Sequence, residues 1–293
     1  MFFMKYILIV YFFILLIQKV YTQQQIEGWF VGNNSHINDF PWEYYTHIHN
    51  YEPLVDKNGF ASCDKTNLEM HYLIETAHKH NTKFIWGLGV DIKEVLWENN
   101  KTMGTIFLNS IGNAMDECNV DGIEADYEWS SLSKLASDGI VLHKYSTKFT
   151  KYLAQIKKNI HPNKTVSCDV GVEGLNGDSY LFEIFPWVNV SMLNNGDIDY
   201  INLMSYHWKK NDILPWQEDI FIFHNLWGIN KNKINLGIGL YHINMLPYEK
   251  KSPIIDKNIM KKLGDYIKRE ELHGAFIFAA TYDNYSNPLI QYL

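Results

Sequence analysis

Short runs of branched and aromatic residues recur along the chain at a nearly constant interval, and this recurrence constrains the fold more than any other feature. Eight such runs begin at Ile26, Thr46, Lys83, Asp121, Thr165, Asp199, Lys233 and Gly274. After a first interval of 20 residues, their starts lie 34 to 44 residues apart, which is the length of a strand, a loop, a helix and a loop. The pattern therefore predicts parallel strands that alternate with helices.

The segments between the runs show helical periodicity. One predicted helix carries Leu68, Tyr72 and Thr76 on a stripe behind the candidate cap Asp64, and a longer helix is predicted around residues 145–156. Eight repeats in the α/β class favour a single (β/α)8 TIM barrel over an open doubly wound sheet, which usually has fewer strands and a Gly-rich phosphate turn. About 34 residues separate the seventh and eighth runs, too few for a large insertion domain.

Acidic residues occupy alternate positions in the fourth run, Asp121-Gly-Ile-Glu-Ala-Asp-Tyr-Glu. Because side chains alternate between the two faces of a strand, Glu124, Asp126 and Glu128 share the face that points into the barrel. Their Cα atoms are about 6 to 7 Å apart in succession, so at least one pKa must rise and one acid must retain its proton. Glu128 lies nearest the C-terminal end of the strand, where barrel enzymes build their sites, and is the candidate general acid. A solvated loop or a structural ion cluster is the alternative interpretation.

The pattern Asp121-Gly-x-x-x-Asp126-x-Glu128 resembles the signature of the family-18 glycoside hydrolases, which include chitinases, chitobiases and endo-N-acetylglucosaminidases. Other segments resemble the family's third, sixth, seventh and eighth strands in the same order. They are residues 83–90, 199–206, 235–241 and 274–278. The resemblance extends from Ile26 to Asp283, and it implies that residues 23–293 form one catalytic barrel.

The resemblance also implies a mechanism: retaining hydrolysis of β-1,4 bonds next to N-acetylglucosamine, with the substrate's own 2-acetamido oxygen as the nucleophile. Glu128 would protonate the glycosidic oxygen, Asp126 would orient the acetamido group, and Tyr206 would donate its hydroxyl to the acetamido oxygen. The implied substrates are chitin oligomers or the chitobiose core of N-glycans, and no cofactor or metal is implied. Candidate substrate-binding residues are Glu124, Trp29, Met204, His207 and Tyr241.

Three positions depart from the family pattern. Glu124 stands where the family usually has Asp, and His207 follows Tyr206 where Asp or Asn is frequent. Ala279 stands about where many members have a Trp beneath the scissile sugar. These departures favour the alternative function, a chitinase-like lectin that binds N-acetylglucosamine-containing glycans without cleaving them. Retention of the acid at Glu128 favours the hydrolase.

The N-terminal residues 1–22 are typical of a secretory signal peptide, because Lys5 precedes an apolar run over residues 6–17. That run is shorter than the roughly 20 residues of a membrane-spanning helix, so we expect no stable membrane insertion, and an uncleaved anchor is the alternative. The expected destination is the cell exterior or a lysosome-like compartment. Five Asn-x-Ser/Thr sequons agree with this route, at Asn33, Asn100, Asn163, Asn189 and Asn284.

The charge of the sequence argues against nucleic acid as a partner. The formal net charge is -7 and the lysines are scattered, so the chain has no basic face for nucleic acid. We also expect a monomer. His71, His78 and His80 fall on one predicted helix, but their spacing does not place them on one face as metal ligands. The three cysteines allow either inert buried thiols or one disulfide with a thiol left over. They are Cys63, Cys118 and Cys168.

Overall fold

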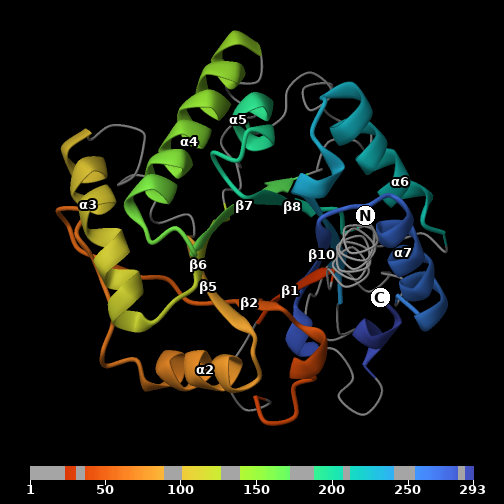
Figure 1. Ribbon diagram of the computed structural model, residues 1–293, viewed down its shortest axis with the longest axis horizontal. Helices are drawn as coiled ribbons and strands as arrows, with labels where there is room; N and C mark the ends of the chain where they lie inside the picture. Colours follow the sequence, from red (N-terminus) through yellow and green to blue (C-terminus); the bar gives the residue numbers. More distant parts are fainter. Residues whose placement is uncertain are drawn as a thin grey trace, which may run out of the picture.

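Eight parallel strands close into a barrel in the computed structural model, with helices around it (Figure 1). The structure describes residues 24–30, 37–88, 101–126, 139–171, 188–206, 212–240, 255–282 and 288–293. Each predicted run coincides with one barrel strand, so the prediction of a single (β/α)8 barrel is confirmed. The strands are β1 (Gln25–Trp29), β2 (His47–His49), β5 (Lys83–Leu88), β6 (Gly122–Ala125), β7 (Thr165–Gly171), β8 (Tyr200–Met204), β9 (Ile234–Gly239) and β10 (Gly274–Phe278).

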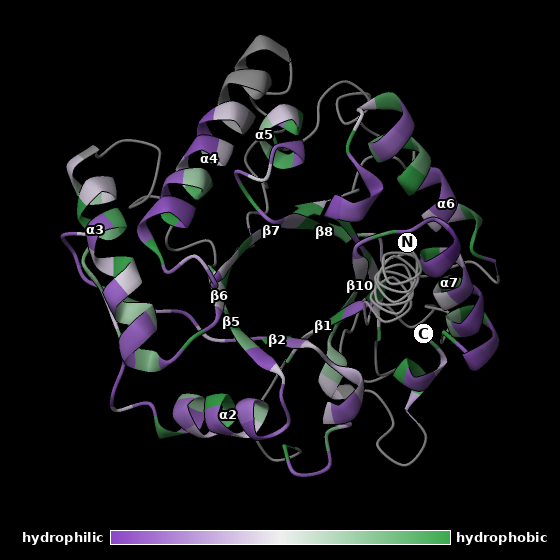
Figure 2. Cartoon of the chain, viewed as in Figure 1, coloured by the Kyte–Doolittle hydropathy of each residue, from purple (hydrophilic) through white to green (hydrophobic). Residues whose placement is uncertain are grey.

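Amphipathic helices cover the outside of the barrel, and in Figure 2 they alternate between hydrophobic and hydrophilic residues. They are α2 (Leu68–Lys79), α3 (Lys101–Cys118), α4 (Gly139–Asn159), α5 (Val190–Asn194), α6 (Leu214–Ile220) and α7 (Lys257–Arg269). Shorter elements are the 3-10 turns η2 (Trp42–Tyr44), η7 (Lys231–Lys233), η8 (Ala280–Tyr282) and η9 (Leu289–Tyr292), the π-helix η6 (Phe221–Leu226), and the two-stranded sheet of β3 (Leu54–Val55) and β4 (Ala61–Ser62). Residues 240–273 contain α7 and leave no room for a large insertion domain.

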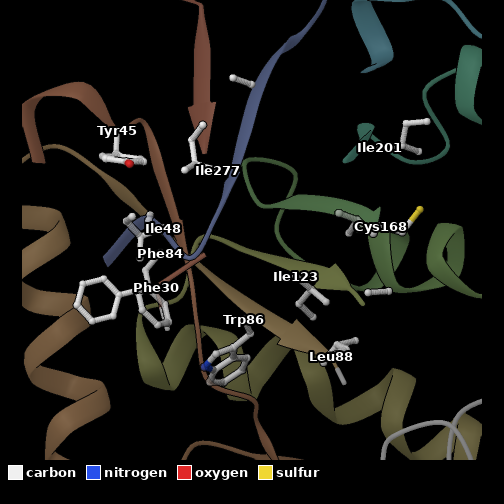
Figure 3. Packing of buried hydrophobic residues seen from close by; sticks show 14 of the residues in the cluster. Phe30, Tyr45, Ile48, Phe84, Trp86, Leu88, Ile123, Cys168, Ile201 and Ile277 are labelled. Atoms are coloured by element: carbon white, nitrogen blue, oxygen red, sulfur yellow. The ribbon is translucent and has the colours of Figure 1, made fainter. Parts of the chain in front are cut away.

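The strands follow one another around the barrel in the order β1-β10-β9-β8-β7-β6-β5-β2, and β2 pairs with β1 to close the ring. Residues that face the helices are apolar and fully buried, as Figure 3 shows for Ile48, Phe84, Ile123 and Ile201. Because strand side chains alternate, the remaining positions point into the barrel, where polar residues replace the apolar ones.

Helix α2 differs from its predicted stripe. Leu68 is 76% exposed and Tyr72 is 44% exposed, so of the predicted positions Thr76 alone is buried. The cap is Asn67, whose side chain accepts a hydrogen bond from the Met70 amide, and not Asp64. The buried face of α2 is wider than the predicted stripe and lies on another side of the helix. It consists of Met70, Leu73, Ile74, Thr76 and Ala77.

Two of the three cysteines are joined. Cys63 and Cys118 form a disulfide with Cα atoms 5.4 Å apart, and Cys168 is a buried free thiol. Of the two possibilities left by the sequence, the single disulfide is therefore the correct one. Within the described ranges, no helix is long and apolar enough to cross a membrane.

Candidate active site

The acid row begins inside the barrel as predicted. Glu124 on β6 is fully buried, and Asp126 directly follows the end of β6, where it is partly exposed. The Asp126 amide donates to the Leu88 carbonyl at 3.1 Å, which extends the pairing of β6 with β5. Ile123 packs outward in the helix-facing core. The candidate acid Glu128 lies outside the described residues.

Side chains from several strands surround Glu124. The Asn202 amide on β8 donates to Glu124 Oε1 at 2.6 Å, and its own carbonyl accepts from Asn235 on β9 at 2.9 Å. Asp169 on β7 lies within hydrogen-bonding reach of the Glu124 carboxyl. On the opposite side, Glu124 Oε2 contacts His49 Nδ1. The carboxyl is therefore fixed by contacts from β2, β7 and β8.

Crowding in this interior has the predicted electrostatic effect. Burial raises the pKa of Glu124 to about 8, and the neighbouring charges of Glu27 and Asp126 contribute to the rise. Burial, together with the charge of Glu124, raises the pKa of Asp169 well above its ordinary value. The pair of Glu124 and Asp169 therefore retains a proton at neutral pH. Sequence reasoning missed Asp169, although it is the one charged residue of strand β7.

A second buried acid lies on the far side of His49. Glu27 Oε2 on β1 is 3.0 Å from His49 Nε2, and both side chains are fully buried. Burial by itself would raise the pKa of Glu27, but the charge and hydrogen bond of His49 outweigh it and lower the pKa to about 2. Next to this pair, burial lowers the pKa of His47 to about 4, so His47 is neutral near pH 7.

Trp29, a predicted sugar contact, lies over these groups. Its indole stacks on the His49 ring with centroids 6.0 Å apart and planes 21° from parallel. The same indole crosses Gly87 on β5, where an added Cβ would lie 2.3 Å from Trp29 Cη2. Glycine at this position therefore makes room for the indole, which covers the buried acids.

The C-terminal ends of β8 and β10 bring two aromatic rings together. Tyr206 follows β8 by two residues, is partly buried, and has its ring centroid 5.2 Å from that of Phe278 on β10. Met204 ends β8 and is also partly buried. The other two predicted contacts, His207 and Tyr241, lie outside the described residues.

The end of β10 presents an aromatic side chain to the interior of the barrel. Alternation along β10 places Phe276 and Phe278 on one face, and Phe276 points inward because its ring contacts His49 edge-on at 5.6 Å. Ala279 ends the strand with a φ of 59° and is buried. Phe278, and not Ala279, therefore occupies the inward position at the end of β10.

One cluster in the described part of the chain has the composition of a metal site. Ligand atoms of Cys63, His71 and Cys118 lie within 4.8 Å of one another. The disulfide uses both thiols, so the cluster does not offer thiolates to a metal. His78, another histidine of α2, contacts the Asp121 carboxylate at 2.7 Å instead.

No family model and no curated protein matches the sequence. Solved structures do match. A chitinase from Bacteroides thetaiotaomicron superposes with a TM-score of 0.67 at 17% identity, over 92% of this chain and 94% of that one. The Bacillus cereus spore cortex-lytic enzyme SleL gives a TM-score of 0.67 at 11% identity, over 92% and 74%.

A chitinase from Cycas revoluta in complex with (GlcNAc)3 gives a TM-score of 0.64 at 12% identity, over 92% of this chain and 98% of that one. Further matches include a GH18 chitinase from Flavobacterium johnsoniae over 92% of this chain. Sequence identities this low show that the fold is shared, but they do not show that the activity is shared. The chain therefore has the fold of the family-18 glycoside hydrolases.

Proposed function

We propose that the protein is a retaining glycoside hydrolase that cleaves β-1,4 bonds next to N-acetylglucosamine, in chitin oligomers or in the chitobiose core of N-glycans. The observation that carries the proposal is the placement of Asp126 and Tyr206 at the C-terminal ends of β6 and β8, above buried acids that retain a proton. Substrates bind at this end of parallel barrels, because the loops that follow the strands converge there.

The proposed reaction uses the substrate's own acetamido oxygen as the nucleophile. Glu128 protonates the glycosidic oxygen, the bond from this oxygen to the anomeric carbon breaks, and the acetamido oxygen bonds to the anomeric carbon. Asp126 stabilises the positive charge of the resulting oxazolinium, and the Tyr206 hydroxyl donates to the acetamido oxygen. Glu128 then removes a proton from a water molecule, whose oxygen bonds to the anomeric carbon from the face that the leaving group left, while the bond from the acetamido oxygen to the anomeric carbon breaks and the acetamido group is restored. The configuration at the anomeric carbon is therefore retained.

The aromatic rings at the barrel mouth suit a sugar substrate. Phe278 and Tyr206 present adjacent ring surfaces, and the apolar face of a pyranose packs well on such rings. In this proposal Phe278 supports the sugar whose bond is cleaved, and Tyr206 binds its acetamido group. Met204 and Trp29 line the part of the interior nearer the buried acids.

A second candidate function is a lectin that binds the same sugars without cleaving them. It is favoured by the contacts of Glu124, which is tied to both His49 and Asn202 and has less freedom to exchange a proton with Asp126. The Glu128 acid, which a lectin does not need, favours the hydrolase.

Hydrolysis of fluorogenic chitobioside and chitotrioside tests the proposal, with peptidoglycan fragments as a further substrate arm. We expect the wild type to cleave a chitooligosaccharide with retention, seen as the β-anomer in early NMR spectra of the product, and Glu128→Gln to lose at least about 100-fold in kcat. Glu117→Gln is the matched control, because Glu117 on α3 is 54% exposed and pairs only loosely with Lys65 at 3.5 Å. A wild type that binds the sugars and cleaves none would establish the lectin.

The same proposal includes passage through the secretory pathway, with residues 1–22 as the cleaved signal. The Cys63–Cys118 disulfide supports it, because disulfides persist in oxidising compartments and are rare in the cytosol. Mass spectrometry of protein expressed with residues 1–22 in a eukaryotic secretory host tests this directly. A product that retains residue 1 would contradict cleavage.

A further inference from the structure

Two carboxyl groups and one imidazole form a buried chain across the barrel interior, the Glu27–His49–Glu124 chain. His49 Nε2 is 3.0 Å from Glu27 Oε2, and His49 Nδ1 contacts Glu124 Oε2. All three side chains are fully buried, and hydrogen bonds to other described residues do not satisfy these four atoms. Two bare acceptors in contact would repel in a dry interior, so each of the two contacts must contain a proton.

The number of protons fixes the charge of the chain. Two protons shared among three groups leave one negative charge, whether His49 is an imidazolium between two carboxylates or a neutral ring beside a protonated Glu124. Moving the proton between His49 Nδ1 and Glu124 Oε2 therefore changes the charge of Glu124, while the total charge of the Glu27–His49–Glu124 chain stays the same. Glu124 can gain or lose a proton inside the barrel, without exchange with solvent.

The proposed mechanism makes this exchange useful. Asp126 is the next inward residue after Glu124 on β6, and the charges of the two acids act on each other. When Asp126 stabilises the oxazolinium, its interaction with Glu124 changes, and the proton affinity of Glu124 must change with it. Resting on the proposed function, we propose that His49 is a positioning residue that supplies and takes up the proton of Glu124 behind Asp126, with Glu27 as its fixed counter-charge.

Every strand that faces His49 is consistent with this role. Acidic groups approach from β1, β6 and β7, a neutral histidine lies on its own strand, and the Tyr200 hydroxyl of β8 lies beside Glu27. From β5, Lys83 shares the inward face with His47, and His273, directly before β10, is a neighbour of Glu27. The titratable neighbours are Glu27, His47, Lys83, Asp121, Glu124, Asp126, Asp169, Tyr200 and His273. His49 is the base in direct contact with two of the acids, and His47 is neutral near pH 7.

Trp29 shields the Glu27–His49–Glu124 chain from solvent. Its indole stacks on His49 and fits against Gly87, so the imidazole is fully buried beneath it. A proton that moves between His49 and Glu124 therefore does so out of contact with solvent.

The pH dependence of kcat/KM for a fluorogenic chitooligosaccharide tests the proposal with three variants. His49→Gln removes the base but keeps a side chain of similar length, so the remaining acids hold their protons more tightly. The acidic limb of the pH profile of kcat/KM should therefore move to higher pH by on the order of one unit. Glu27→Gln removes a negative charge, so the limb moves down by a similar amount. The double variant His49→Gln/Glu27→Gln removes the base and the negative charge together, so the acidic limb of its pH profile should return towards that of the wild type. A purely structural role predicts additive losses of rate with no opposed shifts, and that result would overturn the proposal.

Two controls distinguish a failure of the shared-proton chain from a general effect on folding and from a failure of the proposed function. His47→Gln changes a neutral buried histidine on the same strand, so its acidic limb should stay where the wild-type limb lies. Histidine ring NMR on the sugar-free protein supplies a readout that needs no catalysis: the His49 ring protons should exchange slowly with solvent, and their shifts should change in Glu124→Gln and not in His47→Gln. If the wild type cleaves no sugar, the proposed function fails, while a His49 ring that exchanges freely would overturn the shared-proton chain.

Discussion

Tyr206 and Phe278 lie with ring centroids 5.2 Å apart, although β9 separates their two strands in the barrel. The two rings therefore meet across the inner side of β9, where Gly237 and Gly239 present no side chain to obstruct them. The hydroxyl that would bind the acetamido group and the ring that would support the sugar thus share one surface.

Replacing Phe278 should weaken sugar binding more than it destabilises the fold. Phe278→Ala removes a stacking surface worth about 0.5 to 1.5 kcal/mol, so KM for a chitotrioside should rise about 2- to 10-fold. Phe278→Trp should restore or improve KM, because it enlarges the same platform. Steady-state kinetics measure both, and an unchanged KM in Phe278→Ala would show that the ring does not contact the sugar.

Much of the barrel was predictable, because its strands are nearly continuous apolar runs and their spacing is regular. The acid row was predictable for a related reason: charged residues at alternate positions of an apolar strand stand out. The same signal is present in Glu27 of β1 and in His47 and His49 of β2, and applying it there would have found them. Their pairing with Glu124 was not predictable, since it depends on how the closed barrel places β1, β2 and β6 around one interior.

Local details of the helices were less predictable. Leu68 and Tyr72 have the spacing of a buried stripe but lie on the exposed side of α2, because Met70, Leu73, Ile74 and Ala77 form a wider apolar face. The end of the eighth strand was also hard to place from the sequence. Alternation along β10 puts the Phe278 side chain inside the barrel, and a shift of one residue would reverse which side chains point inward.

The buried acids should make stability depend on pH. Burial raises the pKa of Glu124 from an unfolded value of 4.5 to about 8, so its contribution is complete below 4.5 and is lost as the pH rises through 8. His47 opposes this below 6.5, because its lowered pKa makes stability rise with pH between about 4 and 6.5. From pH 6.5 to 8, the free energy of unfolding of the wild type should therefore fall by up to about 2 kcal/mol.

Glu124→Gln isolates this effect, because the amide has no proton to lose. Its free energy of unfolding, measured by urea denaturation at pH 6.5, 7.25 and 8, should decline less than that of the wild type. A decline as steep as that of the wild type would show that Glu124 does not bind an extra proton in the folded state.

Asn202 should be costly to remove, since it joins two other buried polar groups. Its amide donates to Glu124 at 2.6 Å and its carbonyl accepts from Asn235 at 2.9 Å. Asn202→Ala leaves both partners without this bond and should lower the free energy of unfolding by about 1 to 3 kcal/mol. The exposed Asn195, altered to Ala as a control, should change stability by no more than about 0.5 kcal/mol. Equal effects of the two variants in urea denaturation would contradict the buried network.

The disulfide can be tested by counting thiols and by measuring stability. Of the three cysteines, Cys63 and Cys118 are bonded and Cys168 is a buried thiol, so a thiol reagent should label no site in the native protein. The unfolded but unreduced protein should label one site, and the reduced protein three. Two or more labelled sites before reduction would exclude the bond.

Removing the disulfide should destabilise the fold without altering the chemistry at the barrel mouth. The bond closes a loop with a sequence separation of 55, for which the loss of chain entropy in the unfolded state is worth about 4 kcal/mol. It joins the segment after β4 to the end of α3, on the helical side of the barrel and away from Asp126 and Tyr206. The double variant Cys63→Ala/Cys118→Ala should therefore unfold at lower urea while keeping the wild-type KM at a temperature where it stays folded. A changed KM in the folded variant would mean that this loop shapes the sugar site, and an unchanged midpoint would mean that the bond contributes little to stability.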